Sequence, residues 1–175
     1  MFYGNRQLIL TCIAAMLAGT VLHFVYDWMP CAITALISPI NESLWEHTKI
    51  IFWPYLAAAI LLNHDRPGGI YPWLLTLPAL CAIMLLTAYL YHIPLHGDRM
   101  WVDIGIFVAV MVLGFWLPVQ MSTPFSAGKK VISILMTLVL FLMIVGFTLY
   151  PPKMLLFQEL SSYDQTTGQT PCCLI

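Results

Sequence analysis

The chain has 175 residues, of which 61% are hydrophobic and 9% are charged, and its mean hydropathy is +0.86. A soluble fold of this length could not bury so much apolar surface, so the composition excludes a soluble globular protein and indicates an integral membrane protein with the lipid bilayer as its partner. The net charge of −1 and the absence of a Lys/Arg-rich segment exclude nucleic acid as a partner.

The apolar runs predict an all-α bundle of five transmembrane helices over residues 1–150. Four of the helices are expected at residues 8–28, 70–91, 100–121 and 131–150, each about as long as the 20 residues that a bilayer core requires. Pro151 and Pro152 end the last helix. Residues 151–175 are then expected to form a short C-terminal tail that is partly disordered.

The remaining span, second in the chain, is expected to begin at Ser38, because a serine followed by a proline is a favourable helix start. In that helix Glu42, Glu46 and Lys49 would share one face. The apolar run 50–62 is too short to cross a bilayer alone, so the ionic turn must help to span it. A charge that faces lipid costs about 2.5–3.5 kcal/mol, so these side chains should face protein.

Five alternating spans would bring one set of polar residues to a single side of the membrane. These residues end the first and third spans or begin the second and fourth, and they are His23, Asp27, Glu42, Glu46, His47, Lys49, His92 and Asp103. The opposite side would hold ordinary loop charges. A cluster of acids and histidines on one side of a small bundle indicates a functional site, because ionisable residues within membrane segments are costly to keep.

Basic residues near the span ends set the expected orientation. Arg6, Arg66 and the pair 129–130 fall on one side, and Arg99 and Lys153 fall on the other. The larger number predicts the cytoplasmic side, which puts the N-terminus inside and the C-terminus outside, in a prokaryotic cytoplasmic membrane. Cys172 and Cys173 lie near the C-terminus, and none of the five cysteines has the C-x-x-C spacing of a metal or redox motif.

Two strings of the sequence resemble a known family. Residues 23–28 contain H-x-x-x-D-W, and residues 38–49 contain S-P-x-N-E-S-x-W-E-H-x-K. The chain resembles a family of small, uncharacterised prokaryotic membrane proteins that carry these two signatures. The resemblance covers most of the chain and implies a fold and a site, but no activity.

The polar cluster predicts a metal site, with zinc preferred, because histidine and carboxylate are the usual ligands of a catalytic zinc. We expect His23, Asp27 and His92 as metal ligands and Glu46, together with Glu42, as catalytic carboxylates. The residues expected to bind or orient a substrate are Asn41, His47, Lys49 and Asp103. The protein would then be a metal-dependent, membrane-embedded hydrolase that acts on a lipid or a small molecule.

Two other hypotheses use the same residues. Without a metal, the cluster could bind or transport a small molecule or relay protons. Alternatively, the polar groups could only hold the helices together, with Lys49 neutralising Glu42 or Glu46. The sequence gives neither the substrate nor the oligomeric state.

Overall fold

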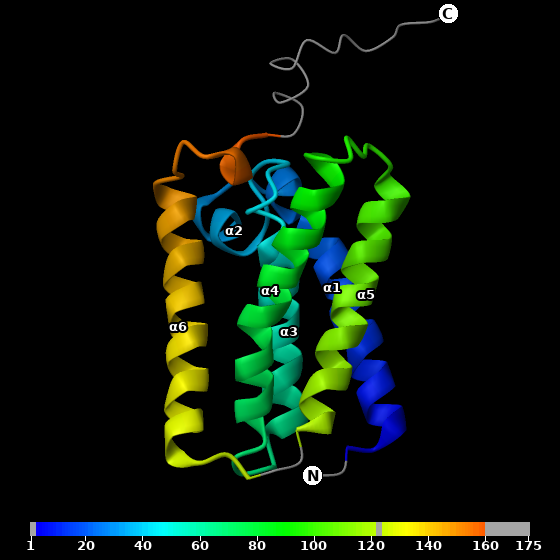
Figure 1. The fold of residues 1–175 in the computed structure, drawn as a ribbon, viewed down its shortest axis with the longest axis vertical. Helices are drawn as coiled ribbons and strands as arrows, with labels where there is room; N and C mark the ends of the chain where they lie inside the picture. The colour runs from blue at the N-terminus through cyan, green and yellow to red at the C-terminus, as the bar shows by residue number, and fades with distance from the viewer. Residues whose placement is uncertain (1–2, 122–123, 160–175) are drawn as a thin grey trace, which may run out of the picture.

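A computed structural model describes residues 3–121 and 124–159. The regular elements of this part are helices, in the order α1 (Asn5–Trp28), α2 (Ala32–Ile37), α3 (Thr48–Asn63), α4 (Ile70–His92), α5 (Met100–Gln120), α6 (Ala127–Leu149) and the 3-10 helix η1 (Leu155–Phe157). The five longer helices run alongside one another as a bundle (Figure 1). The prediction of an all-α fold is confirmed.

Helices α1, α4, α5 and α6 are each long and apolar enough to cross a membrane. The chain is therefore a membrane protein. Helix α3 is apolar but has only 16 residues, so a count of five spans stays a prediction. The orientation of the termini, the cell type and the division at residue 150 also stay predictions.

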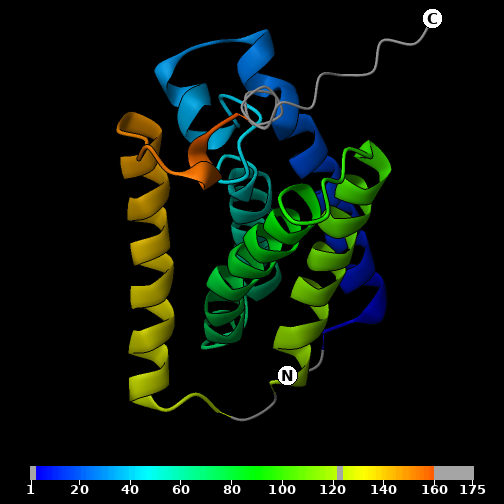
Figure 2. The same cartoon turned by 45° about the horizontal axis from the view of Figure 1, so that its top comes forward.

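Large aromatic side chains fill the bundle near the N-terminal end of α4. Tyr55, Trp73 and Phe115 come from α3, α4 and α5, and their rings lie with centroids 5.2–5.8 Å apart. Tyr55 and Trp73 are fully buried, and the Tyr55 hydroxyl donates to the Gly114 carbonyl at 2.8 Å. The opposite end of the bundle carries the loops that hold the polar residues (Figures 1 and 2).

The prediction of a helix that begins at Ser38 is wrong. Helix α2 ends at Ile37, and the next regular helix, α3, begins only at Thr48. The Ser38 hydroxyl does not cap its own segment, because it donates to the Leu22 carbonyl of α1 and accepts from the Tyr26 amide. Residues 38–47 therefore form a compact loop tied to α1, which we call the site loop.

A buried ion pair holds the site loop against α3. Lys49 Nζ lies 2.6 Å from Glu46 Oε2, and the two side chains are 0% and 5% exposed. The same ammonium donates to the Ala35 carbonyl at 2.7 Å, and the same carboxylate accepts from the Ile40 amide at 2.9 Å. The pair thus joins α2, both ends of the site loop and α3.

The beginning of the predicted tail packs on the site loop. The Trp45 amide donates to the Leu156 carbonyl at 2.9 Å, and the Trp45 ring lies 5.2 Å from that of Phe157. Phe157 in turn packs against Phe147 of α6. Residues 154–157 thus link the site loop to α6, whereas Cys172 and Cys173 lie outside the described residues.

Helix α1 passes close to α3 and α5 at Gly19. A Cβ atom at this position would lie 2.6 Å from the Ile50 carbonyl oxygen and 2.8 Å from the Phe107 ring. We expect Gly19→Ala to destabilise the protein by about 1–3 kcal/mol, because the helices would have to move apart. Thermal unfolding in one detergent would measure this loss.

Gly105→Ala is the matched control, since a Cβ atom there meets nothing within 4 Å. It should leave the unfolding temperature unchanged or raise it slightly, because alanine favours helix more than glycine does. Equal effects of the two substitutions would contradict the close approach at Gly19.

Candidate metal centre

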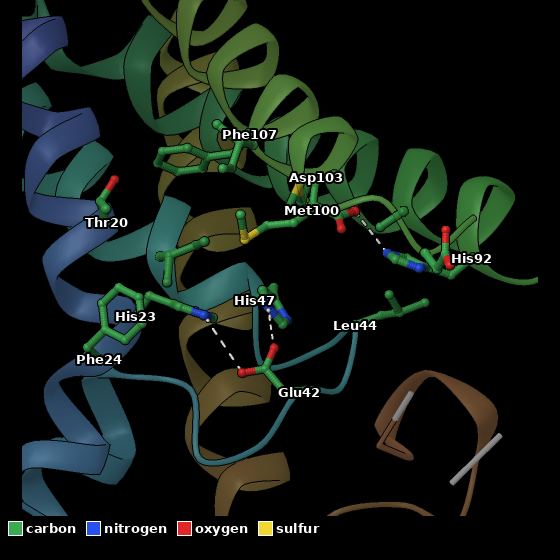
Figure 3. Close-up of a pocket in the computed structure, with 15 residues that line it drawn as sticks. Thr20, His23, Phe24, Glu42, Leu44, His47, His92, Met100, Asp103 and Phe107 are labelled. Atoms are coloured by element: carbon green, nitrogen blue, oxygen red, sulfur yellow. Dashed lines mark hydrogen bonds and ion pairs between the residues drawn. The ribbon is translucent and has the colours of Figure 1, made fainter. Parts of the chain in front are cut away.

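A pocket of about 350 Å³ lies at the loop end of the bundle. Its walls come from α1, α4, α5, the first turn of α3 and the site loop. Figure 3 shows two polar groups facing each other across it, one formed by His23, Glu42 and His47, and the other by His92 and Asp103.

The first group, which we call the His-Glu cluster, consists of His23, Glu42 and His47. One nitrogen or oxygen from each lies within 4.8 Å of the others. The Glu42 carboxylate stands between the histidines, with Oε1 at 3.7 Å from His23 Nε2 and Oε2 at 3.3 Å from His47 Nε2. Two imidazoles and one carboxylate make a three-ligand set that catalytic zinc sites use.

The hydrogen bond of His47 prepares this residue to act as a ligand. Its Nδ1 lies 2.8 Å from the Ser43 carbonyl oxygen. A carbonyl only accepts, so Nδ1 carries the proton, and Nε2 faces Glu42 and the pocket. Metal-bound histidines typically have such a partner on the second ring nitrogen.

Charge coupling within the site loop shifts two pKa values. The hydrogen bond from His47 lowers the pKa of Glu42 below its ordinary value. Burial alone would lower the pKa of His47, but the hydrogen bonds to Glu42 and Ser43 outweigh burial and raise it. The negative charge of Asp103, across the pocket, raises the pKa of His47 further.

These shifts predict how the stability of the metal-free protein depends on pH. The lowered pKa of Glu42 contributes stability above its ordinary value of 4.5, and this contribution is lost as the pH falls through the lowered pKa. The raised pKa of His47 contributes stability below its ordinary value of 6.5, and this contribution is lost as the pH rises through the raised pKa. The pair therefore stabilises the protein most between these two ordinary values.

We expect chelator-treated protein to unfold at a higher temperature at about pH 5.5 than at about pH 8.5. In Glu42→Gln the difference should shrink, because the glutamine keeps the shape of the side chain but removes its charge. An identical pH dependence in both proteins would contradict the coupling between Glu42 and His47.

The second polar group is the pair of His92 at the end of α4 and Asp103 in the first turn of α5. His92 Nδ1 lies 2.8 Å from the Gly97 carbonyl oxygen, and Nε2 lies 2.9 Å from Asp103 Oδ1. The carbonyl accepts, so Nδ1 must donate. A hydrogen bond between Nε2 and Oδ1 requires a further proton, so the pair provides a place for one at the pocket wall.

The structure brings together only some of the residues predicted for the site. Glu42, His23, His47, His92 and Asp103 line the pocket. Glu46 and Lys49 are instead joined in the buried ion pair, and Asp27 is exposed one turn beyond His23. Asn41 accepts from the Ser43 amide at 3.1 Å and so shapes the turn of the site loop.

Sequence reasoning placed His47 among the binding residues and not among the preferred metal ligands. On the expected helix, His47 would point about 100° away from Glu46, and the site loop removes that constraint. Sequence reasoning also missed the apolar wall of the pocket, which includes Phe24, Met84, Ile104 and Phe107. No sequence signal separates these residues from the many other apolar residues of the chain.

No curated protein and no solved structure matches the chain. A family model, described as a family of unknown function (DUF6512), matches residues 3–169 and so spans the whole bundle and the site loop. The chain belongs to the DUF6512 family.

Proposed function

We propose that the protein is a metal-dependent hydrolase embedded in the membrane, with zinc at the His-Glu cluster. The observation that carries the proposal is the convergence of His23, Glu42 and His47, whose ligand atoms lie within 4.8 Å of one another on the wall of a pocket. A zinc ion with three protein ligands keeps a position for water and lowers the pKa of that water to about 7.

The chain's own residues supply the rest of the chemistry. Hydrolysis forms a bond between the oxygen of water and the acyl carbon and breaks the bond from that carbon to the leaving oxygen or nitrogen. The leaving atom needs a proton, and the His92–Asp103 pair holds one across the pocket from the cluster. One proton of the consumed water then restores the pair and the other stays with the acid, so that one water is used for each acid and each alcohol or amine formed.

The Glu46–Lys49 pair has a positioning role in this proposal. The Glu46 carboxylate accepts a hydrogen bond from the amide of Ile40, which lies two residues before Glu42 in the sequence. Glu46 itself directly precedes His47. The pair thus fixes both ends of the segment that carries two of the three ligands. We therefore assign proton transfer to His92 and Asp103 and not to Glu46.

The test is hydrolysis by the protein in lipid nanodiscs, with 4-nitrophenyl esters and acyl anilides as substrates. Hydrolysis should require added zinc, stop in Glu42→Gln and persist in His96→Ala, since His96 is an exposed loop residue outside the pocket. Hydrolysis that is absent from zinc-loaded protein, or equal in Glu42→Gln and wild type, would contradict the proposal.

A further inference from the structure

The pocket has a polar end and an apolar end. The His-Glu cluster and the His92–Asp103 pair form the polar end. The rest of the wall is mostly apolar and includes Met84 and Ala88 of α4 and Phe107 of α5. A small polar substrate would leave that wall in contact with water, whereas a substrate with a hydrocarbon arm would cover it.

The apolar end is closed by a tightly packed floor. Phe107 is 8% exposed, and its ring packs against α1 at Gly19, where a Cβ atom would lie 2.8 Å from it. Beyond this floor, Met111 and Leu80 are fully buried within the packed core. The pocket therefore has the shape of a blind recess, and its volume of about 350 Å³ is near the lower end for sites that bind small molecules.

The pocket is lined by exposed residues both at the loop end of the bundle, where Glu42, Asp98 and Met100 lie, and at the side of the bundle. Phe24 of α1 and Ile104 of α5 both line the pocket, yet both are 44% exposed. Both residues lie on helices long and apolar enough to cross a membrane, so in a bilayer their exposed faces would meet lipid chains. An amphiphile could enter between α1 and α5 without leaving the bilayer.

We propose that the substrate is a lipid-derived amphiphile that enters from the bilayer between α1 and α5. Its hydrocarbon chain lies against Phe24, Ile104 and Phe107, and its head lies at the His-Glu cluster. The inference rests on the proposed function for the chemistry at the head. The recess holds only the part of the chain next to the head, and the remainder of a long chain stays in the bilayer.

The test uses a dodecanoic acid probe that carries a diazirine near its carboxyl group, with the full-length protein in phosphatidylcholine nanodiscs. After illumination, mass spectrometry should locate the label around Phe24, Ile104 and Phe107. In Ile104→Trp this labelling should fall by about tenfold, which corresponds to about two methylene groups kept out of the pocket. Ile104 is partly exposed, so the indole fits without repacking the core.

Val112→Trp is the matched control, because Val112 lies on the same helix, is 51% exposed and is not part of the pocket wall. It should leave the labelling unchanged. Labelling spread evenly over the exposed helices and insensitive to Ile104→Trp would overturn the inference, because the probe would then act only as surrounding lipid.

Zinc content measured on the same samples separates the two proposals. If zinc is bound but the labelling does not change in Ile104→Trp, the proposal of an amphiphilic substrate is overturned and the proposal of a metal site stands. Sensitive labelling in protein that binds no zinc would overturn the hydrolase and support the lipid-binding recess.

Discussion

Lys49→Met is expected to lower the free energy of unfolding by about 3–5 kcal/mol, because it leaves the Glu46 carboxylate buried without its partner. The lost ammonium also donates to the Ala35 carbonyl, so α2 loses one of its hydrogen bonds to α3 and keeps the one from the Trp53 indole to the Leu36 carbonyl. Unfolding by heat or denaturant in a single detergent would measure the loss.

The double variant Lys49→Met/Glu46→Gln separates the lost charge pair from simple packing damage. It should be more stable than Lys49→Met alone, because the glutamine removes the unpaired charge and can still accept from the Ile40 amide. Lys153→Met, at an exposed lysine in the tail, should have little effect. A double variant no more stable than the single one would contradict the buried ion pair.

His92→Ala is expected to slow hydrolysis of an alkyl ester by about 10²–10⁴-fold, the usual contribution of a general acid or base. The same variant should hydrolyse a 4-nitrophenyl ester almost as fast as wild type, because 4-nitrophenolate leaves without a proton. Rates for the two esters, measured on zinc-loaded protein, give this ratio.

Asp103→Asn should reproduce the dependence on the leaving group, because it disrupts the sharing of the proton with His92. His96→Ala should affect neither ester. Zinc content should be normal in His92→Ala, since His92 lies outside the His-Glu cluster. If the rates of hydrolysis of the two esters fell equally in His92→Ala, His92 would not act as the proton donor to the leaving group.

The long apolar helices could be predicted from the sequence because continuous apolar runs and their breaks mark them directly. The predicted third and fourth spans, 70–91 and 100–121, agree with Ile70–His92 and Met100–Gln120 within one residue at each end. The predicted first and fifth spans begin three and four residues later than α1 and α6. Helix starts set by local polar residues are harder to place, since several positions can begin the same helix.

The site loop could not be predicted because tertiary contacts override the local signal at Ser38. Ser38 and Pro39 favour a helix start, but the Ser38 hydroxyl donates to a carbonyl of α1. The Glu46 carboxylate accepts from the Ile40 amide. On a helix, Glu42 and Glu46 would face the same way. In the loop, Glu42 reaches the pocket and Glu46 is buried against Lys49.

For His92 and Asp103, residue type predicted a place at the site but not the contact between the two side chains. Both residues were expected at the site, His92 as a metal ligand and Asp103 as a binding residue. Their hydrogen bond depends on the close approach of α4 and α5 around Gly97, whose carbonyl also meets His92. That geometry favours a shared proton at this pair, whereas residue type and spacing indicated proton transfer here only in the metal-free hypothesis.

The most direct test of the central claim is the metal content of wild type, His47→Ala and His96→Ala, each purified in detergent without an affinity-metal step. We expect about one zinc per chain in wild type and His96→Ala. Loss of a residue that only supports a metal ligand lowers metal affinity by roughly 10–100-fold. Loss of the ligand His47 itself should lower zinc affinity further, so His47→Ala should lose the ion during purification. Folded wild type that binds no divalent metal, even after zinc is added, would contradict the account and favour a metal-free binding site.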